Sequence, residues 1–397
     1  MAGDRKPMPA TYVGREQAFI KHELLKSYLE KLFHIVGLGA RRLGVKELCY
    51  VDCFAGPWSD ESEDLGGTSI AISLAMLEKC RAKLGELGVT PKFRSLYVEK
   101  SQRAFARLEA FLSKRHESEI RAEPRHGDFA DLRQEILRWC GDDAFVFFFI
   151  DPKGWADVGV DILEPLLRRE KSEFLINFQY NFINRTASMD EWRNEIKQLL
   201  GEAVDPAGME PSERERRLVN TYRRNLMLKM PATVAFPARS AYVRVIDPSK
   251  DRPKYHLVYL TCHPRGVVEF MEISETVALI QKQVRASKRD EARARKSGME
   301  DLFGAESLID REEGHVGPDE VDRYWREYLA GGVKVLGEAE FASILERTNW
   351  FPGDLQSSLL RLMDAGLVQN LDAARRRPKK PLHWDKAERL QLLERPR

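Results

Sequence analysis

The stretch of sequence that decides the fold is Ala144-Phe145-Val146-Phe147-Phe148-Phe149-Ile150, followed by Asp151-Pro152-Lys153-Gly154-Trp155. An apolar run of this length, bounded by Gly141-Asp142-Asp143 before it and by Pro-Lys-Gly after it, predicts a fully buried central strand. Asp151 stands at the carboxyl end of this strand, where open α/β sheets bind their ligands. An Asp-Pro-Lys-Gly turn at this edge suits a flat, amine-bearing substrate held beside a cofactor, so the stretch indicates a group-transfer enzyme.

Strands and helices alternate on both sides of this run. Apolar residues at three- and four-residue spacing predict a helix over 14–38, and further strands are expected at 48–54, 93–98 and 174–178. Helical patterns separate these strands, which implies a parallel, doubly wound, Rossmann-like α/β sheet. Residues 188–230 are polar and helical, and we interpret them as an insertion.

The last part of this sheet is expected to be antiparallel. Residues 241–246 and 255–261 predict two strands, and the turn-rich segment 247–253 joins them as a hairpin. A helix over 267–284 follows. We therefore expect a first domain over residues 1–285.

The C-terminal third has a different pattern. Residues 286–317 are charged and weakly periodic, which predicts a linker whose first half is compatible with a helix. Three short helices are then expected around Val321, Phe341 and Leu355, the last capped by Gly366. A short strand, a basic loop and Leu382-His383-Trp384 predict a β-hairpin after them. Three helices and a hairpin are typical of a winged-helix domain, here over 318–397.

Composition narrows the class of protein. The chain has 397 residues and a formal net charge of +2, so nucleic-acid binding would depend on local basic patches. Its five cysteines are dispersed without a C-x-x-C pair, which disfavours a metal site and suits a reducing cytoplasm. No apolar window is long enough to span a membrane, and residues 1–12 lack the core of a signal peptide. We expect a cytoplasmic protein.

Acids stand at four successive strand ends: Asp52, Glu99, Asp128 and Asp151. Because the carboxyl ends of parallel strands share one edge of a sheet, these acids predict a cofactor crevice. The first turn, Asp52-Cys53-Phe54-Ala55-Gly56-Pro57, lets backbone N–H groups approach a cofactor but is not G-x-G-x-x-G. It therefore disfavours NAD and is compatible with S-adenosylmethionine, which has no pyrophosphate.

Two of these acids have specific expected roles. Glu99 is expected to accept hydrogen bonds from both ribose hydroxyls; the alternative is an acid favoured by the dipole of the helix that follows. Asp128, with Phe129 beside it, is expected near the adenine amine. The alternative is that Asp128 is the N-cap of a helix over 129–139.

Asp151 and Pro152 are the expected catalytic residues. Amine methylation requires the nitrogen lone pair to point at the sulfonium methyl group, and a carboxylate and a proline carbonyl can accept the amine hydrogens and so orient it. Trp155 and Tyr180 are placed to stack on a base, with core packing as the alternative, favoured for Trp155. His22 is expected to be exposed or capping rather than catalytic.

The basic loop of the C-terminal domain is the expected nucleic-acid contact. As the wing of a winged helix it could bind phosphates; the alternative is a solubilising loop. Its positive residues are Arg375, Arg376, Arg377, Lys379 and Lys380.

Together these residues resemble a known family, the three-Cys-motif partner proteins. The resemblance covers most of 14–280 and rests on Lys21-His22 and Tyr28-Leu29, on Tyr50 to Pro57, on Gly67 to Ala71 and on Phe149 to Trp155. Members resemble class I S-adenosylmethionine methyltransferases, often with an appended winged helix. They are encoded beside a three-cysteine, radical-enzyme-like protein, which is the expected partner. The turn at 151–154 is also similar to that of tRNA guanine-N2 methyltransferases.

The resemblance implies site residues that agree with this interpretation. Asp52, Phe54 and Gly56 would lie in the cofactor loop, Glu99 at the ribose, Asp128 near the adenine, and Asp151 and Pro152 at the reacting amine; Trp58 stands where a second glycine is usual. We expect an S-adenosylmethionine-dependent enzyme that N-methylates a base of RNA or DNA. The alternatives are a non-catalytic nucleic-acid-binding regulator of the three-cysteine protein, or an enzyme that methylates that partner.

Overall fold

The computed structural model describes residues 8–56, 65–115, 118–233, 235–247, 250, 252–297 and 316–393. The chain folds into two compact units, which we call unit 1 (Met1–Cys262) and unit 2 (His263–Arg397). Within the described ranges, every helix is too short or too polar to cross a membrane.

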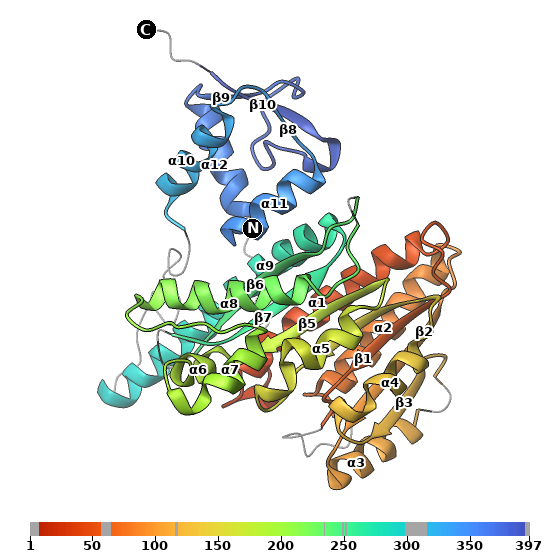
Figure 1. The fold of residues 1–397 in the computed structure, drawn as a ribbon. Helices are drawn as coiled ribbons and strands as arrows, with labels where there is room; N and C mark the ends of the chain where they lie inside the picture. The colour runs from red at the N-terminus through yellow and green to blue at the C-terminus, as the bar shows by residue number, and fades with distance from the viewer. Residues whose placement is uncertain are drawn as a thin grey trace. The chain divides into compact units, whose positions relative to one another are not determined.

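Unit 1 is built on a seven-stranded sheet with the order β3-β2-β1-β4-β5-β7-β6 (Figure 1). Strands β1 to β5 are parallel, and β7 runs antiparallel between β5 and β6. The predicted Rossmann-like sheet with an antiparallel terminal hairpin is therefore confirmed. The strands are β1 (Glu47–Asp52), β2 (Lys92–Glu99), β3 (Arg121–His126), β4 (Ala144–Ile150), β5 (Ser172–Phe178), β6 (Arg239–Ile246) and β7 (Pro253–Thr261).

The order of the strands positions the site. The chain moves outward from β1 to β2 and β3 and then returns to place β4 against the other side of β1. Ligands of open α/β sheets bind outside the carboxyl ends of the strands where the order reverses in this way. In this sheet that point lies between Asp52, the last residue of β1, and Asp151, which directly follows β4.

Helices cover both faces of the sheet (Figure 1), and this explains the uninterrupted apolar run of β4. Tyr28 of α1 lies 5.8 Å from Phe147, ring centre to ring centre, while Val146 and Phe148 point to the opposite face and join a separate core. All seven residues of β4 are buried as a result. The helices of unit 1 are α1 (Glu16–Gly39), α2 (Ser69–Glu86), α3 (Gln102–Ser113), α4 (Phe129–Cys140), α5 (Val160–Leu167), α6 (Tyr180–Thr186), α7 (Arg193–Leu200) and α8 (Pro211–Met227).

Strand β3 has no counterpart among the predicted strands. It pairs only with β2 at the edge of the sheet and contains Pro124, which cannot donate a backbone hydrogen bond. None of its residues is fully buried, so its sequence shows no apolar run. The predicted helical insertion at 188–230 is present as α7 and α8, preceded by α6.

Unit 2 contains four helices within the described residues and a three-stranded antiparallel sheet with the order β8-β10-β9. Glu275 of α9 accepts a hydrogen bond from the backbone N–H of Gly353 at 3.0 Å, at the start of α12. Helix α9 thus belongs to unit 2, and the domain boundary predicted at residue 285 moves to Cys262. The elements are α9 (Pro264–Ser297), α10 (Pro318–Leu329), β8 (Lys334–Leu336), α11 (Glu338–Thr348), α12 (Pro352–Asp364), β9 (Val368–Asn370) and β10 (Glu388–Leu392).

Helix α9 continues to Ser297, in agreement with the helical first half considered for the predicted linker; residues 298–315 lie outside the described residues. One detail of unit 2 differs from the expectation. The second strand of the hairpin is β10, because Trp384–Lys386 forms a 3-10 helix rather than a strand. The predicted cap is confirmed, since Gly366 follows α12 with a φ of +66°.

Candidate functional site

Asp52 ties the first turn of unit 1 to the start of α2. Its carboxylate is fully buried and accepts hydrogen bonds from the backbone N–H of Phe54 at 3.1 Å and from Ser69 Oγ at 2.6 Å. Burial raises the pKa of Asp52 to about 7, although these two hydrogen bonds oppose the shift. The turn expected to hold the cofactor is therefore attached to an acid that titrates near neutral pH.

This titration predicts a pH dependence. The pKa of Asp52 is higher in the folded chain than its ordinary value of 3.8, so unit 1 should lose stability as pH rises from about 4 to 7. In Asp52→Asn this pH-dependent decrease in the free energy of unfolding should be smaller by roughly 2 to 4 kcal/mol, because the amide does not titrate. The free energy of unfolding in urea is measured at pH 5 and pH 8 for wild type and variant, with hydrogen exchange of peptides from β1 and β4 as the probe of unit 1. Equal pH dependence of variant and wild type would contradict the assignment.

Glu99 presents an acceptor that the described residues leave unused. The side chain is 2% exposed, and Oε1 accepts a hydrogen bond from the backbone N–H of Ser101 at 2.5 Å. Oε2 is buried and has no donor among the residues that the structure describes. A buried acceptor without a donor costs about 1–3 kcal/mol, so a ligand hydroxyl would stabilise it. The site thus fits the expected ribose contact.

Asp128 performs the alternative role considered for it. Its carboxylate accepts a hydrogen bond from the backbone N–H of Ala130 at 2.9 Å and caps α4, and Lys100 Nζ lies 3.6 Å away. A contact with adenine stays a prediction. Phe129 is buried, and its ring lies 5.1 Å from that of the half-buried Phe54, so the two rings form an apolar wall beside the first turn.

The first turn is described as far as Gly56. Pro57 and Trp58, which complete the motif in the sequence, lie outside the described residues. The backbone N–H of Ala55 donates to the carbonyl of Val98 at 2.8 Å, and that of Cys53 donates to Phe149 at 3.0 Å. These bonds hold the turn between the ends of β2 and β4, where a cofactor would lie.

Asp151 has two partners that sequence reasoning did not assign. Lys21 of α1 forms an ion pair with Oδ2, and Asn177 Nδ2, at the end of β5, donates to Oδ1 at 2.6 Å. Exposed fractions of 13% for Lys21 and 18% for Asp151 leave the pair reachable by a ligand. One signal was available in the sequence: Asn177 is a polar amide within the apolar run 174–178. Pro152 is buried next to Asp151.

Two aromatic residues considered for stacking on a base both pack inside unit 1. Trp155 is half-buried and stacks on Phe182 with ring centres 5.5 Å apart, which confirms the core-packing alternative. Tyr180 is also buried and its ring lies 4.9 Å from that of His256, so stacking of Tyr180 on a base is wrong.

His22 is buried rather than exposed, and it is not a helix cap. Tyr12 Oη lies 2.9 Å from its Nδ1, and burial, with the charges of Lys21 and Arg15, lowers the pKa of His22 well below its ordinary value. The expectation of an exposed or capping histidine is therefore wrong.

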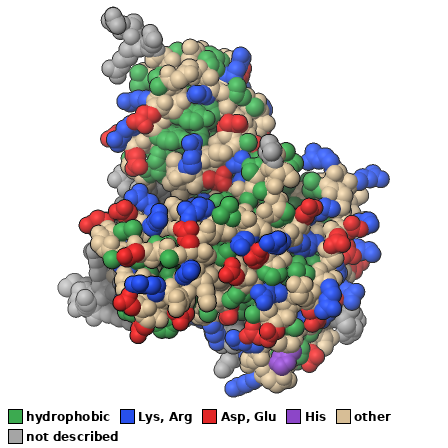
Figure 2. All heavy atoms as spheres, viewed as in Figure 1, with side chains coloured by type: hydrophobic (Ala, Val, Ile, Leu, Met, Phe, Trp, Pro, Cys, Tyr) green, Lys and Arg blue, Asp and Glu red, His purple; other side chains and the backbone are tan. Residues whose placement is uncertain are grey.

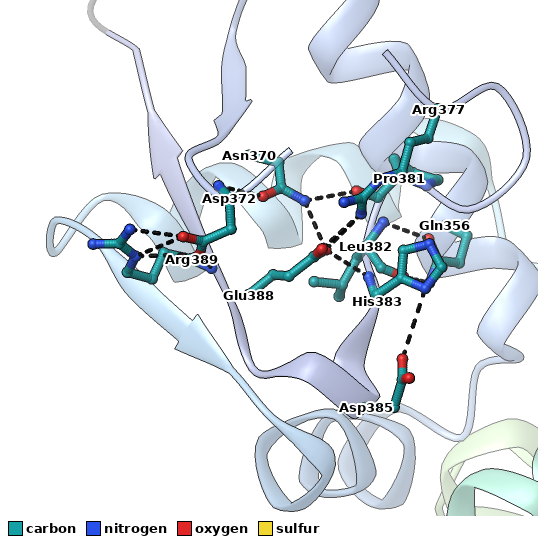
Figure 3. Close-up of polar contacts among 10 residues, drawn as sticks. All are labelled: Gln356, Asn370, Asp372, Arg377, Pro381, Leu382, His383, Asp385, Glu388 and Arg389. Atoms are coloured by element: carbon teal, nitrogen blue, oxygen red, sulfur yellow. Dashed lines mark hydrogen bonds and ion pairs between the residues drawn. The ribbon is translucent and has the colours of Figure 1, made fainter. Parts of the chain in front are cut away.

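The basic loop of unit 2 is largely neutralised from within (Figure 3). Arg377 Nη1 donates to both oxygens of the buried Glu388, at 2.7 and 2.9 Å. Arg376 forms two hydrogen bonds with Asp364, at 2.6 and 2.7 Å, and Lys380 Nζ lies 3.9 Å from Glu272. Among the described residues, only Arg375 and Lys379 of the five have no such acidic partner.

Comparisons with known proteins leave the family open. No family model matches the chain, and no curated protein matches it. It is similar to the solved structure of an O-methyltransferase from Bacillus cereus in complex with SAH, at 12% identity, 64% coverage of this chain, 92% of that chain and a TM-score of 0.33.

Two further solved structures are similar at the same level. Protein LPL1258 from Legionella pneumophila is 11% identical, with 66% of this chain and 91% of that chain covered and a TM-score of 0.35. M. jannaschii TYW2 in complex with AdoMet is 12% identical, with 56% of this chain and 72% of that chain covered and a TM-score of 0.25. Similarities this low carry no argument about activity, and the fold assignment rests on the strand order itself.

Proposed function

We propose that this protein is an S-adenosylmethionine-dependent methyltransferase that N-methylates a base of RNA or DNA. One observation carries the proposal: the adjacent strands β2 and β1 end in Glu99 and Asp52, and Asp151 directly follows β4, at the point where the strand order reverses. The unpartnered Glu99 Oε2 suits a ribose hydroxyl, the turn after Asp52 suits the body of the cofactor, and Asp151 suits a substrate amine.

The residues of the chain have distinct tasks in this reaction. S-adenosylmethionine, when bound, supplies an electrophilic methyl group on a sulfonium sulfur. Asp151 accepts a hydrogen bond from the substrate amine and so directs its lone pair toward that methyl group. When the N–C bond forms and the S–C bond breaks, the amine must lose one proton, and the carboxylate of Asp151 is the acceptor already in place.

Cofactor binding tests the first part of the proposal. Glu99→Ala removes the acceptor at the end of β2, and S-adenosylmethionine should then bind more weakly by roughly 1.5–3 kcal/mol, the scale of hydrogen bonds to a charged group. Glu99→Gln keeps one acceptor oxygen and should lose less. Calorimetry on folded variants measures both affinities. Unchanged affinity in Glu99→Ala would remove Glu99 from the site.

A second candidate function follows from unit 2. We propose that residues 316–393 form a winged-helix domain, because three helices, a short strand and a hairpin follow in the order α10-β8-α11-α12-β9-β10. This supports a nucleic-acid-binding role, with or without catalysis. Lys and Arg side chains are interspersed with Asp and Glu on the face shown in Figure 2, so binding would depend on a local group of charges.

The unpaired loop residues give a specific test. Arg375→Glu with Lys379→Glu should weaken binding of a labelled oligonucleotide at low salt and lower the salt slope by about 2, since two phosphate contacts are lost. Arg323→Glu with Arg326→Glu, an equal charge change on α10, should leave the slope unchanged. Fluorescence anisotropy over a salt series measures both. An unaltered slope in the loop variant would leave the loop as a solvated surface.

Transfer of a labelled methyl group distinguishes the functions. Label in nucleosides, identified by mass spectrometry, supports base methylation. Label in the three-cysteine partner protein supports methylation of that partner. Nucleic-acid binding without any transfer supports the non-catalytic regulator.

A further inference from the structure

Asn177 is a buried amide near the carboxyl end of β5. It is the residue before Phe178, with which β5 ends. All seven residues of this strand are buried, and the side chain of Asn177 is 3% exposed. Strand pairing places β5 directly beside β4, whose end carries Asp151. A polar group in such a position requires hydrogen-bond partners.

The orientation of this amide follows from its neighbour. Asn177 Nδ2 donates to Asp151 Oδ1 at 2.6 Å. An ionised carboxylate only accepts hydrogen bonds, so the reversed amide would place two acceptors against each other. The –NH2 group of Asn177 therefore faces the carboxylate, and the amide oxygen is the end left over.

That amide oxygen accepts no hydrogen bond within the described part of the chain. Asn177 Oδ1 is buried, and none of the residues that the structure describes donates to it. Both ends of an amide are attached to one carbon, so Oδ1 lies beside the same carboxylate that Nδ2 contacts. Asp151 thus stands next to a second acceptor, which a donor from a ligand would stabilise.

Lys21 balances the charge of Asp151, so a ligand that binds Asp151 and Asn177 Oδ1 does not itself have to be positively charged. Its ammonium group forms an ion pair with Asp151 Oδ2 and compensates the negative charge of the carboxylate. Each carboxylate oxygen has a further lone pair after it accepts one hydrogen bond. Asp151 can therefore keep Lys21 and Asn177 as partners while it accepts a hydrogen from a substrate.

We infer that Asn177 Oδ1, in place of the Pro152 carbonyl expected from the sequence, and Asp151 accept the two hydrogens of a primary amine, so the substrate is an exocyclic –NH2 group on a flat ring. The inference rests on the proposed function and specifies its substrate class. A hydroxyl group has one hydrogen and a ring nitrogen of a neutral base has at most one, so neither satisfies both acceptors. With both hydrogens held, the nitrogen lone pair is left for the methyl group. One N–C bond forms, one S–C bond breaks, and one amine proton passes to Asp151.

A variant and a matched control test the acceptor. Asn177→Leu keeps the side-chain size and removes the acceptor together with the Nδ2 donor to Asp151. Asn184→Leu removes a buried amide oxygen in α6 that likewise has no donor, and no hydrogen bond with Asp151, among the residues that the structure describes. The assay uses the full chain, labelled S-adenosylmethionine and single-stranded oligonucleotides rich in adenine, cytosine or guanine. We expect Asn177→Leu to lower the turnover by tenfold or more with cofactor affinity within about twofold of wild type. Asn184→Leu should change neither.

A change in the substrate tests the same point with the unaltered protein. An oligonucleotide whose target amine already carries one methyl group has a single N–H, and its methylation should be at least tenfold slower than that of the –NH2 form. Equal rates for the two substrates, or wild-type turnover of Asn177→Leu, would overturn the inference and leave the proposed function intact. If the protein binds S-adenosylmethionine but transfers no methyl group to any amine-bearing base, both the inference and the proposed function would be overturned.

Discussion

Asp151→Asn is expected to lower methyl transfer by on the order of a hundredfold or more, the scale of a mispositioned reacting group. Asp151 accepts from two donors, Lys21 on Oδ2 and Asn177 on Oδ1. An asparagine at position 151 has only one acceptor oxygen, so its –NH2 group would face either the Lys21 ammonium or the Asn177 amide donor. The side chain of residue 151 therefore rotates or shifts. The substrate amine then loses its acceptor and its orientation.

The structure also excludes a purely structural role of Asp151 as the cap of the helix that follows β4. A helix cap would tolerate Asn, but α5 begins at Val160 with Gly159 as its N-cap, so Asp151 caps neither α5 nor the 3-10 helix after Trp155. Turnover and calorimetric cofactor affinity should be measured on the same folded protein, with affinity nearly unchanged. Wild-type turnover would exclude Asp151 from catalysis.

Glu388→Ala is expected to destabilise the hairpin of unit 2 by about 2 to 4 kcal/mol, because it removes the acceptor of a buried network. Glu388 is 3% exposed and accepts hydrogen bonds from Arg377, from Asn370 Nδ2 at 2.9 Å and from the backbone N–H of His383 at 2.7 Å (Figure 3). Without the carboxylate, Arg377 loses its counter-charge and the loop loses its attachment to β10. Hydrogen exchange of β9 and β10 amides in the full chain measures the loss.

The neighbouring exposed pair provides the control. Arg389 and Asp372 lie on the same hairpin and are in contact at 2.7 Å, with side chains 53% and 32% exposed. Asp372 also accepts the backbone N–H of Arg389 at 2.7 Å, which an asparagine oxygen can still do, so Asp372→Asn should leave the exchange rates nearly unchanged. Glu388→Met with Arg377→Met removes both charges and should be less damaging than Glu388→Ala alone. Protection that persists in Glu388→Ala would contradict the assigned role.

The same residue gives unit 2 a sensitivity to acid. Burial alone would raise the pKa of Glu388, but hydrogen bonds from His383, Asn370 and Arg377 hold it below its ordinary value of 4.5. Its stabilising contribution is therefore present above pH 4.5 and is lost as pH falls through the lower pKa of the folded state.

Local patterns in the sequence were sufficient for most of the sheet. The seven apolar residues of β4 require burial on both faces, and the turn-rich segment between β6 and β7 requires a hairpin; both follow from residues close together in the chain. Edge strand β3 and the three-residue strand β8 were missed because neither carries an apolar run long enough to show a period. Such short, half-exposed strands are stabilised by pairing with an adjacent strand, which is β2 for β3 and β10 for β8.

The sequence by itself determined the Rossmann-like sheet and the acids at its strand ends, since hydrophobic period and strand boundaries are local properties. Only the tertiary structure decided what those acids contact. Lys21 reaches Asp151 across 130 positions of sequence, and Asn177 does so only because β5 lies beside β4. Arg375 and Arg377 look alike in the sequence, yet the second is neutralised by Glu388. Such contacts join residues distant in the chain, and their partners are chosen by packing rather than by residue type.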